Sequence, residues 1–266
     1  MLVHPQIDPI IFSVGPVAVR WYGLMYVIAF VAFVTLAKVR IRRGLVPTLV
    51  ESDIDDLLLY GVLGVIVGGR LGQVLFYEPG YYFENPIEIV KVWKGGLSFH
   101  GGFLGVLTAV WIFCHRRGKR WLAVMDAVAP AVPPGIAAGR LGNFINQELP
   151  GRVTDVPWGM WFPAIDPGGP VARHPSQLYQ VGLEGLALFF ILWWFASKPR
   201  PVGAISGVFL VGYGVFRSVA EFVRQPEASV QGVFLGVTLG QWLSLPMVLV
   251  GIAMIAWAYK KQPLSS

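Results

Sequence analysis

The chain has 266 residues, of which 55% are hydrophobic and 14% are charged, and its mean hydropathy is +0.61. A soluble domain carries about 25% charged residues, so this composition excludes an ordinary water-soluble protein. The net charge of +6 would suit a nucleic-acid-binding protein, but basic cytoplasmic loops give a membrane protein the same balance. We therefore expect a membrane protein without a nucleic-acid partner. The single cysteine, Cys114, excludes an intrachain disulfide.

Seven stretches of the chain are long and apolar enough to cross a bilayer, because a span needs about 20 mostly apolar residues. The segments between them carry charge, proline or both. In chain order, the predicted spans are about 19–37, 54–77, 97–114, 122–145, 177–196, 204–224 and 239–259. The sequence thus predicts an all-α integral membrane protein of about seven transmembrane helices, with residues 1–266 forming a single polytopic domain.

The basic residues divide unevenly between the two ends of these spans. Twelve of the 21 Lys and Arg residues lie in segments on one side, namely Lys38, Arg40, Arg42, Arg43, Arg116, Arg117, Lys119, Arg120, Lys198, Arg200, Lys260 and Lys261. Only six lie on the other side, namely Arg20, Lys91, Lys94, Arg152, Arg173 and Arg224. Since basic loops concentrate in the cytoplasm, we expect an outer N-terminus and a cytoplasmic C-terminus. The second, fourth and sixth spans then run outward.

Two segments on the outer side are long. Residues 78–96 are predicted to form an arm along the membrane interface, and residues 146–176, rich in Pro, Gly and Trp, a small head. Loops of this length are often functional. Within the spans, glycines four residues apart predict close helix packing; these pairs are Gly64 with Gly68, Gly135 with Gly139, and Gly203 with Gly207.

Three arginines lie inside predicted spans, near the outer ends of the outward-running helices: Arg70, Arg140 and Arg217. A charge there costs about 2.5–3.5 kcal/mol on insertion scales and usually faces protein or water. Arg217, Glu221 and Arg224 share one helix face by their spacing. One carboxylate inside the spans leaves a surplus of positive charge, which calls for an anion, and guanidinium suits phosphate. The alternative is that each arginine reaches the headgroups or pairs structurally.

The fourth span adds polar partners, since Asn143 lies one turn beyond Arg140. His100 lies at the outer start of the third span, between glycines, and histidine exchanges protons near neutral pH. The alternative for His100 is a hydrogen-bonding strut. His4 and His115 are expected at the surface. His, Cys, Asp and Glu show no metal-ligand spacing, so we expect no metal.

Several motifs resemble those of bacterial prolipoprotein diacylglyceryl transferases, along nearly the whole chain. The strongest is Gly-Arg-Leu-Gly-Asn-Phe-Ile-Asn-Gln-Glu-Leu-Pro-Gly-Arg at 139–152. The others are Arg-Trp-Tyr-Gly-Leu-Met-Tyr at 20–26, Gly-Arg at 69–70, Phe-His-Gly-Gly at 99–102, Arg-His-Pro-Ser-Gln-Leu-Tyr at 173–179, Gly-Tyr-Gly-Val-Phe-Arg at 212–217 and Glu-Phe-Val-Arg-Gln-Pro at 221–226.

The resemblance implies a seven-helix bundle in the bacterial inner membrane, with arm and head segments and an active site on the periplasmic side. It implies transfer of the diacylglyceryl group of phosphatidylglycerol to the lipobox cysteine of a prolipoprotein, with membrane lipids as surroundings and no cofactor. By motif position it implies catalytic roles for His100, Arg140 and Arg217. Substrate-binding roles are expected at Tyr22, Arg70, Asn143, Glu148, Gly151 and Glu221.

Two other classes of protein remain possible from the residues alone. A transporter or flippase could use the arginines as an anion site, and such proteins often have paired half-chains and helices broken near mid-membrane. A structural assembly factor would need no buried charge. The position of the arginines near the outer membrane boundary favours an enzyme.

Overall fold

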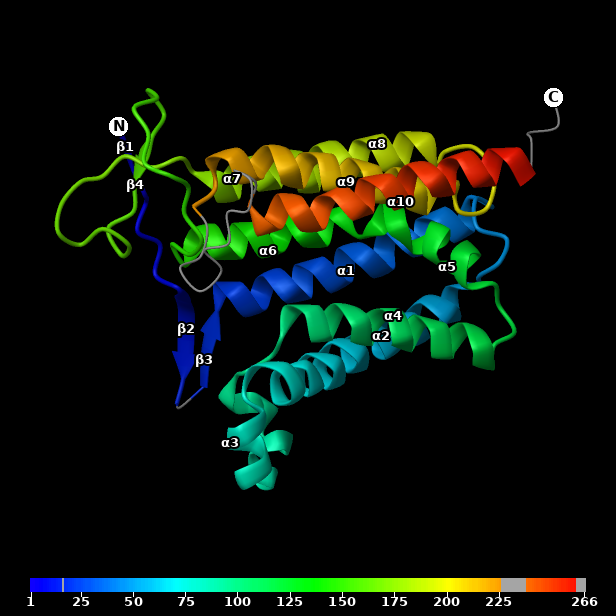
Figure 1. The fold of residues 1–266 in the computed structure, drawn as a ribbon, viewed down its shortest axis with the longest axis horizontal. Helices are drawn as coiled ribbons and strands as arrows, with labels where there is room; N and C mark the ends of the chain where they lie inside the picture. Colours follow the sequence, from blue (N-terminus) through cyan, green and yellow to red (C-terminus); the bar gives the residue numbers. More distant parts are fainter. Residues whose placement is uncertain (16, 226–237, 262–266) are drawn as a thin grey trace. The chain divides into compact units, whose positions relative to one another are not determined.

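The computed structural model describes residues 1–15, 17–225 and 238–261. The chain forms two compact units. The large unit comprises Met1–Val39 and Met125–Ser266, and the small unit comprises Arg40–Val124. Both units are mostly helical (Figure 1).

The large unit combines long helices with short strands. Strand β1 (Leu2–Val3) pairs in parallel with β4 (Met160–Trp161), and β2 (Ile10–Val14) pairs antiparallel with β3 (Val17–Arg20). The helices of this unit, which run side by side in Figure 1, are α1 (Trp21–Arg42), α6 (Pro133–Ile145), α7 (Ser176–Gln180), the π-helix η5 (Val181–Ala187), α8 (Leu188–Phe195), α9 (Ala204–Val223) and α10 (Leu239–Lys261). Their core includes Ala129, Leu188, Leu192, Ala196 and Ile205.

The small unit is an antiparallel helix pair with an appended arm. Its elements are α2 (Glu51–Gly72), which continues as a π-helix (Gln73–Tyr77), then α3 (Pro79–Glu84), two 3₁₀ helices (Pro86–Val90 and Val92–Lys94), and α4 (Phe99–Arg116). Helix α5 (Trp121–Val128) and a 3₁₀ turn (Ala129–Ala131) then lead into the large unit.

Helices α2 and α4 approach each other so closely that only glycine fits between them. A Cβ on Gly105 would lie 2.0 Å from the carbonyl oxygen of Gly64, and a Cβ on Gly68 would lie 2.4 Å from that of Gly101. Small residues allow this approach in lipid, where van der Waals contact drives helix association. The predicted close packing at Gly64 and Gly68 is therefore confirmed.

In the other two predicted glycine pairs, only one glycine packs closely against a neighbouring helix. A Cβ on Gly135 would meet Ala29 at 3.4 Å, in ordinary contact, but one on Gly139 would meet nothing within 4 Å. Gly207 does pack closely, since a Cβ there would lie 2.8 Å from the Gly251 oxygen of α10. Gly203 instead precedes α9 with φ of 97°, a left-handed conformation that favours glycine.

Asp126 fixes where α9 begins. Its buried carboxylate accepts hydrogen bonds from the backbone N–H groups of Gly203, at 2.6 Å, and Ser206, at 2.7 Å. The Ser206 hydroxyl donates to the same carboxylate at 2.6 Å. An acidic group satisfies the orphan N–H groups of a helix start and complements its dipole.

Among the described residues, five helices are long and apolar enough to cross a membrane, and a sixth span results if one bent pair is counted. The pair comprises Trp121–Ala131 and Pro133–Ile145, with a bend of 48°. Proline lacks an N–H and clashes with the preceding turn, which explains the bend in the predicted span 122–145. Helix α4 covers the predicted span 97–114 but is not among the five. The protein is thus a multi-pass membrane protein, while the count of seven spans stays a prediction.

His4 does not lie on the surface as expected. It is 1% exposed, and its Nε2 hydrogen-bonds the Phe144 carbonyl at 2.9 Å. The ring also lies against Phe144 and Phe162, with centroids 4.7 and 5.4 Å away. The surface prediction was wrong because nothing in the sequence near His4 indicates that strand β1 pairs with the head.

Candidate functional site

Two of the predicted catalytic arginines lie on either side of one buried carboxylate in the large unit. Arg140 comes from α6 and Arg217 from α9, and between them lies Glu184 of η5. Arg140 Nη2 is 3.6 Å from Glu184 Oε2, and Arg217 Nη1 is 3.7 Å from Glu184 Oε1. The Glu184 side chain is fully buried, while those of Arg140 and Arg217 are 21% and 14% exposed.

A second carboxylate holds the α9 arginines. Arg217 Nη2 lies 2.9 Å from Glu221 Oε2, and Arg224 Nη1 lies 3.7 Å from the same oxygen. The predicted alignment of Arg217, Glu221 and Arg224 on one face of a helix is confirmed. Helix α10 begins directly against this face, because a Cβ on Gly240 would lie 2.8 Å from the Glu221 Cδ.

Sequence reasoning missed Glu184. It assumed that Glu221 is the one carboxylate within the spans, although Glu184 falls inside the predicted span 177–196. The rule that identified the arginines, that an ionisable residue inside a span is functional by default, would have identified it too. The surplus of positive charge in the cluster is accordingly smaller than expected.

A strained turn follows α6 and presents Glu148. Gln147 and Leu149, on either side of it, have φ of 55° and 54°, which is uncommon for residues other than glycine and often marks functional sites. Glu148 Oε2 accepts from Asn143 Nδ2 at 2.9 Å, and Oε1 accepts from Asn146 Nδ2 at 3.1 Å. The structure therefore brings together Asn143 and Glu148, both predicted to bind substrate.

Gly151 lies where three backbone segments meet. Its N–H donates to the His174 carbonyl at 3.0 Å, and it pairs with Arg224 at the end of α9. A Cβ here would lie 2.3 Å from the His174 oxygen and 2.8 Å from the Val223 oxygen. Since backbone atoms cannot move aside easily, only glycine fits.

Tyr22 contacts α6 through another glycine. A Cβ on Gly142 would lie 2.8 Å from the Tyr22 ring, so α1 and α6 pack closely at this point. Tyr22 also makes an edge contact with Tyr26, with centroids 5.3 Å apart. Gly142 lies between Arg140 and Asn143 in the sequence of α6, two residues after the first and one before the second.

An ion pair orders the predicted head. Arg173 donates from Nε and Nη2 to the two oxygens of Asp166, at 2.6 and 2.8 Å. This bidentate pair lowers the pKa of Asp166, chiefly through the hydrogen bonds from Arg173. Arg173 also hydrogen-bonds the Gln225 side chain, and it thereby ties the head to the end of α9.

In the small unit, the Arg70 guanidinium binds the arm. Its nitrogens donate to the carbonyls of five residues, Glu88, Ile89, Lys91, Gly95 and Gly96, and to the Tyr82 hydroxyl. Its Cζ lies 4.9 Å from the centre of the Tyr82 ring. Gly95 and Gly96 have φ of 87° and 74°. The turn that these angles form directs both carbonyls to the Arg70 guanidinium. These contacts are those of a structural clamp, and the role of Arg70 in substrate binding stays a prediction.

His100 lies in the first turn of α4 in the small unit and is exposed. Ser98 caps this helix by accepting from the Gly101 N–H at 3.2 Å. The glycines around His100 have structural explanations, because Gly101 packs against Gly68 of α2 and Gly96 belongs to the arm turn. They therefore give no separate support to the predicted proton transfer by His100.

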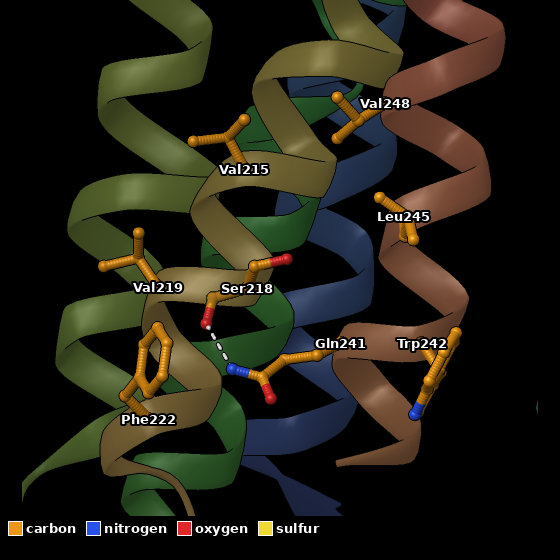
Figure 2. A pocket seen from close by; sticks show the side chains of 8 residues that line it. All are labelled: Val215, Ser218, Val219, Phe222, Gln241, Trp242, Leu245 and Val248. Carbon is orange, nitrogen blue, oxygen red and sulfur yellow. Dashed lines mark hydrogen bonds between the residues drawn. The ribbon is translucent and has the colours of Figure 1, made fainter. Parts of the chain in front are cut away.

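A groove runs between α9 and α10 in the large unit (Figure 2). Its walls are mostly apolar, with Val215, Val219 and Phe222 on α9 and Leu245 on α10. Gln241 Nε2 donates to the backbone carbonyl of Ser218 at 3.5 Å across the groove. Ser218 directly follows Arg217, but consecutive residues of a helix point about 100° apart, so the groove lies on a different face of α9 from the arginines.

Comparisons with known proteins show the family of the chain. The sequence model of the prolipoprotein diacylglyceryl transferase family matches residues 9–257. Curated proteins named phosphatidylglycerol–prolipoprotein diacylglyceryl transferase are similar along the whole chain. That of Dechloromonas aromatica is 59% identical, covering 99% of this chain and 100% of its own. That of Nitrosospira multiformis is 58% identical, covering 98% and 90%, and that of Cupriavidus necator is 57% identical, covering 99% and 97%. The chain belongs to the prolipoprotein diacylglyceryl transferase family.

Proposed function

We propose that this protein transfers the diacylglyceryl group of phosphatidylglycerol to the thiol of a lipobox cysteine in a prolipoprotein. The observation that supports this best is the pair of arginines, from α6 and α9, on either side of Glu184. Buried guanidinium groups in a span favour a phosphate ligand, because they offer paired N–H donors and a permanent charge. Curated relatives more than half identical to the chain bear the name of this activity.

In the proposed reaction, the cysteine sulfur attacks the terminal glyceryl carbon. A C–S thioether bond forms, the C–O bond to phosphate breaks, and the phosphate oxygen keeps the electron pair. The thiol proton passes to a base, and glycerol phosphate leaves. The phosphodiester carries one negative charge and the leaving monoester gains another, so arginines stabilise the transition state more than the substrate. Such stabilisation is larger in a water-poor site.

Each predicted residue except Arg70 has a role in this scheme. Arg140 and Arg217 bind the phosphate, and Glu221 orients Arg217 through the 2.9 Å ion pair. Asn143 and Tyr22 bind the glycerol headgroup, while Glu148 and Gly151 shape the entrance to the site. His100 accepts the thiol proton, since the thiolate is the nucleophile.

The proposed topology has seven spans in the bacterial inner membrane, with a periplasmic N-terminus and a cytoplasmic C-terminus. The excess of basic residues in the segments after α1, α4, α8 and α10 supports this orientation. It places Arg140 and Arg217 toward the periplasmic side, with the arm at 78–96 and the head at 146–176 on that side as well.

The test is direct. Purified protein is incubated with phosphatidylglycerol and a lipobox peptide, and the peptide is examined by mass spectrometry. We expect the peptide to gain one diacylglyceryl mass and an equal amount of glycerol phosphate to appear. If the peptide gains no mass and labelled lipid instead moves between the leaflets of a vesicle, the protein is a transporter.

A further inference from the structure

Glu184 lies between Arg140 and Arg217 but accepts no hydrogen bond from either guanidinium. Its oxygens are 3.6 and 3.7 Å from the nearest nitrogens of Arg140 and Arg217, which is longer than a hydrogen bond. Among the described residues, neither carboxylate oxygen nor Arg217 Nη1 has a hydrogen-bond partner. The carboxylate therefore contributes its charge to the cluster, while Arg217 Nη1 stays free to donate to a ligand.

The local fold brings this carboxylate to the arginines. Glu184 lies in the π-helix η5, and such wide turns occur often at functional sites. The next residue, Gly185, packs so closely on α6 that a Cβ there would lie 2.6 Å from the Ala137 Cβ. Ala137 is one helix turn before Arg140. The close approach of η5 to α6 thus sets Glu184 beside Arg140.

The charges of the cluster nearly balance. Arg140, Arg217 and Arg224 contribute three positive charges, and Glu184 and Glu221 contribute two negative charges, all within the ion-pair contacts described above. With both carboxylates ionised, the cluster carries a net charge of +1. That charge matches a phosphodiester, which has one negative charge, but not a phosphate monoester, which approaches two near neutral pH because its second pKa is about 6.

We propose that Glu184 determines which phosphate the site retains: it lets the arginines hold the singly charged phosphodiester of the lipid and weakens their hold on the doubly charged monoester product. This inference rests on the proposed function, in which a diester is consumed and a monoester is released. Glu184 is a positioning and specificity residue in this scheme, since it acts through the arginines. Without the negative charge of Glu184, the cluster would have a net charge of +2, which matches the doubly charged monoester product.

The experiment compares two soluble ligands that differ in charge, glycerol phosphate and its methyl diester. Their binding to the purified protein is measured by competition with phosphatidylglycerol. In Glu184→Gln, which keeps the shape and removes the charge, we expect glycerol phosphate to bind at least about 10-fold more tightly and the methyl diester less than about 3-fold more tightly. We also expect stronger product inhibition. Glu184→Asp, which keeps the charge, should restore the wild-type ratio.

Glu88→Gln is the matched control, since this carboxylate pairs with Lys91 and Lys94 on the arm; it should leave both affinities unchanged. Equal changes for the two ligands in Glu184→Gln, or no change, would overturn the inference. If Glu184→Gln does not fold, the wild-type affinities still test the inference. Binding of glycerol phosphate 10-fold or more tighter than binding of its methyl diester would contradict a cluster with a net charge of +1. Failure of the peptide to gain diacylglycerol would instead refute the proposed function.

Discussion

Gly240 of α10 lies directly against the carboxylate of Glu221 of α9: a Cβ at Gly240 would lie 2.8 Å from the Glu221 Cδ and 2.9 Å from both oxygens. Glu221 in turn pairs with Arg217 at 2.9 Å. The start of α10 therefore helps to set the position of a predicted catalytic arginine. Because the atoms in conflict are the end of a flexible side chain, an added methyl group would displace the carboxylate rather than unfold the helix pair.

We therefore expect Gly240→Ala to reduce transfer at least about 10-fold with little change in thermal stability. The comparison is Gly182→Ala in η5, where a Cβ would meet nothing within 4 Å; it should keep near-normal activity. Peptide lipidation and the unfolding midpoint in detergent are measured for both variants. Full activity in Gly240→Ala would show that the Glu221 contact does not position Arg217 for the reaction.

Removal of either site arginine should abolish transfer. We expect Arg140→Ala and Arg217→Ala each to lower the rate by at least about 100-fold, as loss of one preorganised donor to a developing anion typically does. Arg140→Lys and Arg217→Lys should recover only part of the rate, because lysine lacks the planar fork. Membrane insertion and thermal stability serve as controls. An arginine whose alanine variant keeps normal turnover does not take part in the mechanism.

The sequence predicted where most of the long helices lie because composition and proline mark their ends, and it predicted that Arg217 and Glu221 share a helix face, but it missed Glu184. It could not distinguish two similar motifs. Arg70 and Arg140 both lie in Gly-Arg-Leu-Gly, yet Arg70 binds backbone carbonyls of the arm and Arg140 faces Glu184. The difference comes from tertiary partners, which periodicity does not encode. The same holds for His4, whose burial depends on the pairing of β1 with the distant strand β4.

Loss of Arg70 should loosen the arm. Arg70→Ala would leave several carbonyls of 88–96 without their charged donor, and hydrogen bonds to charged groups contribute about 1.5–3 kcal/mol each at most. We expect a lower unfolding midpoint and faster proteolysis within 78–96, measured by mass spectrometry of the fragments. Arg70→Lys should rescue little, since one ammonium cannot reach so many acceptors. An unchanged cleavage pattern would contradict the clamp.

The role of His100 can be tested by the pH dependence of its variants. If His100 accepts the thiol proton, His100→Asn should lower the maximal rate and flatten its dependence on pH. Rates are measured from pH 5.5 to 9 at saturating lipid. His115→Asn, at an exposed histidine at the other end of α4, is the control. A near-normal rate in His100→Asn at neutral pH would leave thiol activation to the arginines.

His4 makes the junction between the N-terminus and the head sensitive to acid. Its Nε2 donates to the Phe144 carbonyl at 2.9 Å, and its Nδ1 accepts from the Gln6 N–H at 3.0 Å. The contact at Nδ1 needs the neutral ring, because a protonated Nδ1 cannot accept a hydrogen bond, and burial lowers the pKa of His4 below its ordinary value of 6.5. The unfolded segment therefore binds more protons than the folded one as the pH falls through about 6.5. The stabilisation is present above that pH and is lost below it.

We accordingly expect the N-terminal segment to become more accessible to protease at pH 5 than at pH 8 in the wild-type protein. His4→Gln should remove much of this difference, because the glutamine amide can donate to Phe144 and accept from Gln6 without titrating. His115→Gln, at an exposed position, should keep the difference. Cleavage before Trp21 is quantified by mass spectrometry at both pH values. Equal pH dependence in His4→Gln and the wild type would mean that a group other than His4 controls this junction.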